Sequence, residues 1–421
     1  MNKLNEILKS ALNKVKPSEE EMNEINGKSE ELIKIIKEEL KKIDIKTEVF
    51  VGGSFAKGTL IKKKNYDIDI FARFSGEVNS NFLEEALRKI SNNIEKIHGS
   101  RDYFIIKDKN RVYEIVPVKM IKTPREAENS ADLSYFHVNY VKGRIAKNKK
   151  LANDILLAKA FCYASGCYGA ESYVMGFSGY AIELLVLHYK GFLQFIKAMA
   201  KAKSKIILDD AKHYKGKEEL LAFVNEAKLQ SPIIVIDPTF KERNATAALS
   251  NNTFKKFQDN CRKFLNKPSL TFFEEKEFDI GAIKKEAKKK KAELISLALT
   301  TDRQAGDIAG TKLRKVSEFI LREIEKYAVV IRKEFDYDGK KTARAYFAVK
   351  KEKKLLLKGP PIKMTEHAER FRQAHKKTIV KKGVLYAVEN IGKIADILNK
   401  AIKDKREALR EMGVTGVKVL P

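Results

Sequence analysis

The chain has 421 residues, 43% of them hydrophobic, which is enough to bury a sizeable core and predicts two to four domains. Its net charge of +28 indicates a polyanionic partner such as nucleic acid or an acidic membrane surface, with a lysine-biased genome as the alternative. The three cysteines, Cys162, Cys167 and Cys261, form no CxxC pair, which argues against a cysteine-ligated metal and indicates reduced, intracellular thiols.

The first 22 residues form an amphipathic, charged pattern that predicts a helix and not a signal peptide. No apolar run approaches the length of a membrane span. We therefore expect a cytoplasmic protein with no membrane partner.

The first third of the chain alternates between helix and strand patterns. After two opening helices, the pattern predicts a strand at 48–54, a short helix at 55–60, a strand at 66–74, a helix at 81–99, and a hairpin at 102–120 that turns at 107–110. These elements predict a compact α+β domain, to which we assign residues 1–144.

The rest of the chain divides by composition. Residues 145–263 carry apolar side chains at helical spacing and predict a helical central domain. Beyond it, lysine-rich stretches flank strand-like segments, and we assign residues 264–421 to a basic α+β C-terminal region. Residues 263–421 carry 39 Lys and Arg against 22 Asp and Glu, so they hold +17 of the total charge.

The strand at 66–74 contains an Asp-x-Asp pair between isoleucines. Residues two apart face the same side of a strand, so Asp67 and Asp69 point together while Ile68 and Ile70 point into the core. Paired carboxylates repel unless a cation lies between them, and ligands that are all oxygen favour Mg²⁺ over zinc. Glu114, the acid in an otherwise apolar stretch, is a candidate third ligand from a neighbouring strand. The alternative is an edge strand with one solvent-facing side.

Two glycines and a serine precede this strand. Gly52, Gly53 and Ser54 are small enough to let backbone N–H groups at a helix start approach an anion closely, which suits phosphate. Metal-holding carboxylates beside a phosphate-binding turn predict phosphoryl-transfer chemistry.

The motifs GGSFAKGT, DIDIF and EIVP together resemble the nucleotidyltransferase superfamily that includes DNA polymerase β and the poly(A) polymerases. Four further blocks are similar to the archaeal, class I CCA-adding enzymes, which finish tRNA 3′ ends: FHVNYVKGRI, ASGCYGAESYVMGFSGYAIELLVLHY, VIDPTFKERNATAALS and PSLTFFEEK. The resemblance covers roughly residues 40–280 and implies a nucleotidyltransferase head, a helical central nucleotide-binding domain and a C-terminal tRNA-binding region.

The resemblance also implies roles for individual residues. Asp67 and Asp69 match the paired metal ligands, and Glu114 stands where the third carboxylate is usually an aspartate. The matched nucleotide-binding positions are Gly53, Ser54, Lys57 (commonly arginine in the family), His137, Lys159 and Tyr168 for the phosphates, and Arg243 for the base.

Four of these residues have plain structural alternatives. Lys159 in an apolar helix needs an anion or a route to water. By the alternative interpretations, His137 is a core histidine, Tyr168 a helix-turn cap and Arg243 a surface-loop residue.

The predicted function is CCA addition to tRNA from CTP and ATP, with Mg²⁺ as the cofactor and release of pyrophosphate. A poly(A) polymerase or an A-adding-only enzyme is the alternative within the superfamily, and a non-enzymatic RNA-binding protein is the alternative outside it. The sequence leaves the oligomeric state open, with a homodimer as one expectation.

Overall fold

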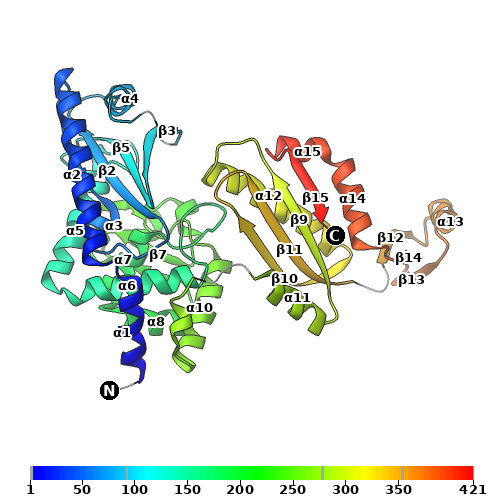
Figure 1. Ribbon diagram of the computed structural model, residues 1–421. Coiled ribbons are helices and arrows are strands. Elements are labelled where there is room, and N and C mark those ends of the chain that lie inside the picture. Colours follow the sequence, from blue (N-terminus) through cyan, green and yellow to red (C-terminus); the bar gives the residue numbers. More distant parts are fainter. Residues whose placement is uncertain (1–2, 92, 100, 276–278, 352–354, 421) are drawn as a thin grey trace. The chain divides into compact units, whose positions relative to one another are not determined.

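The computed structural model describes residues 3–91, 93–99, 101–275, 279–351 and 355–420. The chain forms two compact units (Figure 1). The first contains residues 1–170 and 174–275, and the second contains residues 276–421 together with the short loop Glu171–Tyr173. In the described parts of the chain, no helix is long and apolar enough to cross a membrane.

A five-stranded mixed sheet organises the start of the first unit. Its strands are β1 (Thr47–Val51), β2 (Tyr66–Phe74), β3 (Ile94–Ile97), β4 (Tyr103–Asp108) and β5 (Arg111–Lys119), in the spatial order β1-β2-β5-β4-β3. Strands β2 and β5 pair in parallel, and the other neighbours pair antiparallel. Helices α2 (Glu19–Lys42) and α4 (Ser80–Arg88) pack apolar side chains against one face of this sheet, as Figure 1 shows for α2.

The sequence prediction for this sheet is largely confirmed, but the strand predicted at 48–54 ends at Val51, and the short helix predicted at 55–60 is α3 (Gly53–Ala56). Strand β2 has the predicted bounds, and β4 and β5 form the predicted hairpin. The predicted helix at 81–99 is wrong in its second half, because α4 ends at Arg88 and Ile94–Ile97 forms β3. Ser91 and Asn93 favour a turn, with the Asn93 N–H donating to Ser91 Oγ at 3.1 Å, and the open edge of β4 then accepts a further strand.

Helices dominate the rest of the first unit. They are α1 (Lys3–Val15), α3 (Gly53–Ala56), α5 (Ser134–Lys147), α6 (Lys150–Ala164), α7 (Gly179–Tyr189), α8 (Phe192–Lys201), α9 (Lys217–Phe223) and α10 (Asn251–Asn266). Short 3-10 helices occur at Pro124–Glu126, Glu226–Leu229 and Leu270–Phe272. Helices α6, α7, α8 and α10 share one apolar core, in which the ring of Phe161 lies among those of Phe192, Phe257 and Phe264.

A small sheet accompanies these helices and is absent from the sequence prediction. Its strands are β6 (Ile206–Leu208), β7 (Ile233–Asp237) and β8 (Phe240–Asn244), in that spatial order. Every residue of β7 is buried, so this strand brings Asp237 into the interior.

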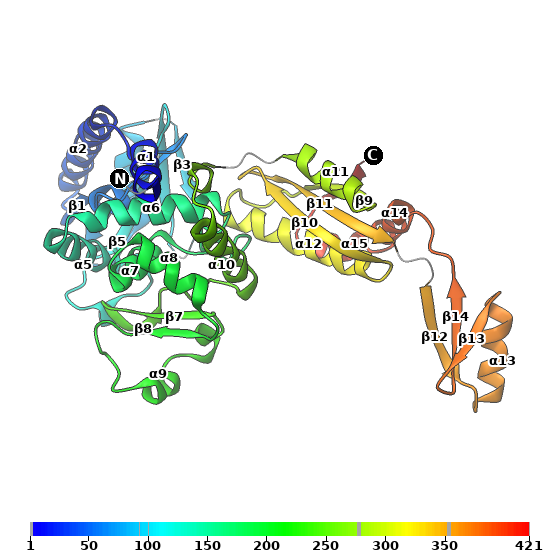
Figure 2. The same ribbon diagram turned by 90° about the horizontal axis from the view of Figure 1, so that it is seen from below.

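The second unit is built on a four-stranded antiparallel sheet. Its strands are β9 (Glu293–Thr300), β10 (Ala328–Tyr337), β11 (Thr342–Lys351) and β15 (Gly416–Leu420), in the spatial order β10-β11-β9-β15. With helices α12 (Asp307–Glu325) and α14 (Ile394–Asp404) they give the chain order β-α-β-β-α-β of ferredoxin-like folds. Apolar residues of α12 and α14 cover one face of the sheet, and α11 (Ile280–Lys289) lies on the other (Figure 2).

A further segment is inserted between β11 and α14. It contains strands β12 (Leu355–Pro361), β13 (Thr378–Lys381) and β14 (Val384–Glu389), in the order β12-β14-β13, with helix α13 (Thr365–Ala374). Helix α15 (Arg406–Glu411) then leads into β15.

Candidate active site

The three predicted carboxylates lie on one face of the first sheet. Asp67 and Asp69 come from β2, and Glu114 on β5 pairs in register with Asp69. Ile68 and Ile70 have no exposed surface and point into the core on the opposite face. The predicted division of β2 into an acidic face and an apolar face is therefore confirmed.

The carboxylates raise one another's proton affinity. Burial and the charges of Asp69 and Asp67 raise the pKa of Glu114 to about 7. Burial also raises the pKa of Asp69, with Asp67 adding to the rise and Lys57 opposing it. A divalent cation would relieve this repulsion, so the chemistry of the three acids fits such an ion.

The side chains of the three acids do not converge on a single metal-binding position. Within the described residues, no three or more His, Cys, Asp or Glu side chains gather into a group that could hold a metal ion. Asp67 is exposed, and its carboxylate lies 3.5 Å from the Lys63 ammonium. The structure therefore places the three acids on one face without assembling a complete coordination shell.

The turn between β1 and α3 contacts the central acid directly. The Gly52 N–H donates to the Asp69 carbonyl at 2.8 Å, and Gly53 has a φ of +54°. A Cβ atom on Gly53 would overlap the Asp69 carboxylate, so only glycine fits. No described residue hydrogen-bonds the Ser54 hydroxyl, which leaves it available to a ligand.

Two of the predicted phosphate-binding lysines meet at a buried acid. Glu183 on α7 is fully buried, and its carboxylate lies 2.7 Å from the Lys57 ammonium and 2.8 Å from that of Lys159. Thr59 donates its hydroxyl to the same carboxylate at 2.7 Å and accepts from Lys159 through its carbonyl at 3.1 Å. Glu183 is therefore the anion that Lys159 requires in its apolar helix. The Lys159 side chain does not extend to water, because Lys159 is only 2% exposed.

The charge states of this cluster, Lys57–Glu183–Lys159, are strongly coupled. Burial raises the pKa of Glu183, but the charges of Lys159 and Lys57 outweigh it and lower that pKa to about 2. Burial lowers the pKa of Lys159 to about 8, although Glu183 opposes the change. The cluster places two lysine side chains around one buried carboxylate.

A second buried acid organises the remaining predicted residues. Asp237 at the end of β7 has no exposed surface, and its carboxylate lies 2.8 Å from His137 Nε2 and 2.8 Å from Arg243 Nη1. Tyr180 donates its hydroxyl to the same carboxylate at 3.0 Å. Despite burial, His137 and Arg243 lower the pKa of Asp237 well below its usual range. The histidine and the arginine, which lie 106 positions apart in the sequence, thus share one carboxylate.

Tyr180 connects the two acid clusters. Its ring stacks on His137 with centroids 4.1 Å apart, and Arg243 and Lys57 lie 5.5 and 5.8 Å from the ring centroid. Tyr180 and Glu183 are three residues apart on α7, which places them on the same side of that helix. One helix face therefore supports most of the predicted nucleotide-binding residues.

Tyr168 occupies a separate position near the start of α7. It forms a β-bridge with Phe177, and a Cβ atom on Gly179 would lie 2.8 Å from its hydroxyl. The Lys63 ammonium lies 5.4 Å from its ring centroid, and Lys63 also approaches Asp67. Tyr168 is thereby linked to the carboxylate face through a lysine.

Glu183, Asp237 and Tyr180 are absent from the site residues predicted from the sequence. Glu183 and Asp237 did carry a signal, since each is a lone acid in an apolar stretch, IELLV and IIVID. Tyr180 had no such signal, because an aromatic residue in an apolar helix is ordinarily a core residue.

Two family models match the first unit. The nucleotidyltransferase domain matches residues 30–125, and the second domain of tRNA nucleotidyltransferases matches residues 153–274. The first range contains the three carboxylates, and the second contains both buried acids that organise the lysines, the histidine and the arginine.

Individual proteins are similar over most of the chain. The CCA-adding enzyme of Nanoarchaeum equitans is 34% identical over 349 residues, which cover 82% of this chain and 84% of the relative. That of Methanocaldococcus jannaschii is 30% identical over 400 residues, covering 91% and 87%. Among solved structures, Cid1, described by its RNA terminal uridylyl transferase activity, is similar with a TM-score of 0.52 at 15% identity, covering 66% of this chain and 99% of that one. This last likeness concerns the fold alone.

Proposed function

The chain belongs to the family of the archaeal CCA-adding enzymes, and from this premise we propose that it adds C, C and A to the 3′ end of tRNA, using CTP and ATP and releasing pyrophosphate. The observation that carries the proposal is the acidic face of β2 and β5 beside the helix start at Gly53. Carboxylates next to free backbone and hydroxyl donors suit the transfer of a nucleotidyl group from a triphosphate.

We assign metal binding to Asp67, Asp69 and Glu114, and we take the ion to be Mg²⁺, because hard oxygen donors prefer it. When bound, the ion would neutralise charge on the triphosphate and acidify the attacking 3′-hydroxyl. The raised pKa of Glu114 supports this assignment, since a cation would offset the repulsion of Glu114 by Asp69 and Asp67.

We assign the triphosphate to Ser54, Lys57, His137, Lys159 and Tyr168. This arrangement favours triphosphate-binding side chains that are held in fixed positions. Glu183 holds Lys57 and Lys159, and Asp237 holds His137. Groups that are already oriented need little reorganisation when charge develops in the transition state.

The base of the incoming nucleotide is assigned to Arg243, whose side chain is 26% exposed, compared with 11% for His137 in the same cluster. The tRNA is assigned to the basic C-terminal region, and we keep the division of the chain at 1–144, 145–263 and 264–421 as a proposal. A homodimer and a cytoplasmic location also stay predictions. Light scattering of the purified protein tests the homodimer.

The experiment that tests the function supplies a tRNA that lacks its 3′ end, Mg²⁺ and each labelled nucleotide separately. We expect incorporation of CTP and then ATP, and no addition of UTP or GTP. Long homopolymers made from ATP without use of CTP would instead indicate a poly(A) polymerase. Binding of RNA with no incorporation would indicate a non-enzymatic protein.

The same assay tests the metal assignment. Asp67→Ala or Asp69→Ala should lower the incorporation rate at least about a hundredfold, because a lost ligand removes several kcal/mol of transition-state stabilisation. The fold and tRNA binding should be retained, as circular dichroism and a filter-binding assay would show. Near-unchanged turnover in either variant would refute the assignment.

A further inference from the structure

The two oxygens of the Asp237 carboxylate bind two different sets of partners. Oδ1 accepts from the Thr239 N–H at 2.9 Å, from the Thr239 hydroxyl at 2.8 Å and from the Tyr180 hydroxyl at 3.0 Å. Oδ2 accepts from Arg243 Nη1 at 2.8 Å and lies 2.8 Å from His137 Nε2. The three contacts to Oδ1 fix the plane of the carboxylate, so the direction in which Oδ2 meets the arginine is fixed too.

The main chain of Arg243 is also held in place. The next residue on β8, Asn244, is 4% exposed. Its side chain accepts from the Val235 N–H at 3.0 Å and donates to the Lys228 carbonyl at 2.7 Å. Arg243 is thus held at its backbone by its neighbour and at its tip by Asp237. An arginine that is held at both ends loses little freedom when a ligand binds.

Only one side of the Arg243 guanidinium is used within the protein. Nη1 donates to Asp237, while Nε and Nη2 make no hydrogen bond with any described residue. The guanidinium is planar with its N–H groups in fixed directions, so holding one nitrogen also sets the directions of the others. These remaining donors suit the acceptor atoms on the edge of a base.

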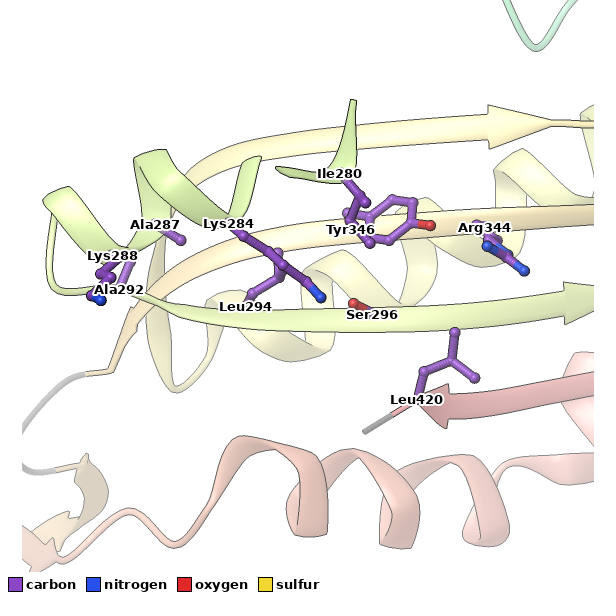
Figure 3. Close-up of a pocket in the computed structure, with 10 residues that line it drawn as sticks. All are labelled: Ile280, Lys284, Ala287, Lys288, Ala292, Leu294, Ser296, Arg344, Tyr346 and Leu420. Carbon is purple, nitrogen blue, oxygen red and sulfur yellow. The ribbon is translucent and has the colours of Figure 1, made fainter. Parts of the chain in front are cut away.

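Convergence on one atom distinguishes this cluster from a pocket of about 390 Å³ in the second unit (Figure 3). That pocket has Lys288 at one end, beside Ala292, and Arg344 at the other. The cations of the pocket therefore face no common partner, whereas Arg243 and His137 both meet Oδ2 of Asp237.

We propose that Asp237 is a positioning residue for nucleotide selection, because it sets the direction in which Arg243 presents Nε and Nη2 to the base of the incoming nucleoside triphosphate. Asp237 has no exposed surface, so it acts through Arg243 and does not touch the base itself. This inference rests on the proposed function, since it takes Arg243 as the residue that reads the base.

Asp237→Asn keeps the shape of the side chain but leaves one acceptor oxygen for two sets of donors. Three donors face Oδ1, so the amide oxygen should stay there and the amide nitrogen should face Arg243 and His137. His137 can accept from that nitrogen through its other tautomer, whereas an arginine N–H can only donate. The substitution should therefore release Arg243 in particular.

Steady-state incorporation on a tRNA that lacks its 3′ end measures the release. In Asp237→Asn the ratio of kcat/KM for CTP to kcat/KM for UTP should fall about tenfold, mainly through a higher KM for CTP, with kcat changed less than about threefold. Circular dichroism and urea unfolding check that the variant is folded. Unchanged selectivity in the folded variant would overturn the inference.

Glu242→Gln is the matched control. Glu242 precedes Arg243 on β8, is exposed, and its side chain makes no hydrogen bond or ion pair with a described residue. The control removes the same charge beside the same arginine, so it should change the selectivity ratio less than about twofold. An equal loss in Glu242→Gln and Asp237→Asn would assign the effect to net charge and contradict positioning.

A double-mutant cycle separates positioning from a structural role. If Asp237 acts through Arg243, Asp237→Asn should cause no further loss of selectivity in an Arg243→Ala background. A carboxylate that only stabilises the hairpin of β7 and β8 would add its effect to that of Arg243→Ala. Additive losses would overturn the inference.

Arg243→Lys tests the inference with the buried carboxylate left intact, which covers the case in which Asp237→Asn does not fold. Lysine has a single nitrogen, and when it bonds Asp237 no second nitrogen extends toward the base. Arg243→Lys should therefore lose most of the selectivity that Arg243→Ala loses, although the charge is retained. Full selectivity in Arg243→Lys would refute positioning by Asp237.

The wild-type protein separates failure of this inference from failure of the proposed function. If it adds C and A to truncated tRNA but Asp237→Asn or Arg243→Lys keeps full selectivity, only the role of Asp237 is wrong. If the wild-type protein adds neither nucleotide, the function itself is wrong.

Discussion

Glu183 is a fully buried carboxylate that holds two lysines, Lys57 and Lys159, at 2.7 and 2.8 Å. Each lysine would be costly to bury without this partner, since an unpaired buried charge strongly destabilises a fold. The lysines belong to different elements, the segment after α3 and helix α6, so the acid also ties the sheet region to the helices. Any change at Glu183 should therefore affect stability and the nucleotide site together.

Replacing Glu183 with glutamine should lower the free energy of unfolding by about 3–5 kcal/mol, because Lys57 and Lys159 lose their counter-charge. Urea unfolding at pH 7 measures this loss. Glu226→Gln is the control, because Glu226 is exposed and makes no ion pair with a described residue. A loss below about 1 kcal/mol in Glu183→Gln would contradict the structural role of the cluster.

The pH dependence of stability should also report Glu183. Its pKa is lowered to about 2 in the folded protein from an ordinary value of 4.5, so its contribution is present above about pH 4.5 and is lost as the pH falls toward 2. Glu183→Gln should lose this part of the acid dependence, measured as unfolding free energy between pH 5 and 3. An unchanged acid slope in the variant would show that other groups cause it.

Arg243 is the residue that we expect to read the base. Arg243→Ala should slow both C and A addition and reduce discrimination against UTP and GTP, without abolishing metal-dependent chemistry, since Asp237 keeps its bonds to His137 and Tyr180. Single-nucleotide incorporation on tRNAs one and two residues short of CCA measures the change.

The control for Arg243 is Lys241→Ala, which removes an exposed cation from the same strand. Loss of only one of the two correct nucleotides, or full selectivity in Arg243→Ala, would assign base recognition to other residues.

At the scale of elements, the turn from β1 to α3 places a glycine against the central carboxylate. Gly53→Ala should lower the incorporation rate about a hundredfold, because the new methyl group displaces the Asp69 carboxylate and a shift of about 1 Å is costly to catalysis. Single-turnover incorporation at saturating CTP measures the rate.

Gly58→Ala provides a control with a similar backbone. Gly58 also has a positive φ, +66°, but nothing lies within 4 Å of the position of an added Cβ atom. In both variants the alanine must adopt the left-handed backbone conformation, which should cost about 1 kcal/mol of stability. The two variants therefore differ only in the collision of the new methyl group with Asp69. Similar rates in the two variants would exclude that collision as the cause.

At the scale of the whole molecule, charge is concentrated in the second unit. Residues 276–421 carry 37 Lys and Arg against 20 Asp and Glu, a net +17. The first unit keeps Phe273 in its own core, where this ring is 6% exposed, so a truncation should follow Glu275 to leave the core intact.

Removing residues 276–421 should weaken tRNA binding far more than binding of free CTP. The lost affinity should be the salt-dependent part, because it comes from phosphate contacts that release counterions. Binding isotherms for tRNA and for CTP at several salt concentrations measure both. Unchanged tRNA affinity at every ionic strength would place the RNA contacts in the first unit.

The sequence alone determined the local features of this protein. The period of two in residues 66–74 predicted β2 and its acidic face, and helical spacing predicted the helical region to which α6, α7, α8 and α10 belong, although not its small sheet. These predictions succeeded because each depends on side-chain direction within one element. The ordered family blocks supplied the catalytic family, which the comparisons confirm.

Only the tertiary structure decided which charges meet. Lys57 and Glu183 are 126 positions apart, and His137 and Asp237 are 100 apart, so no local pattern could pair them. Strand β3 escaped prediction for the same reason, because it forms on the free edge of β4 and overrides a helical pattern. Long-range pairing and burial, which act only in the folded chain, turn separate lysines, a histidine and an arginine into one organised site.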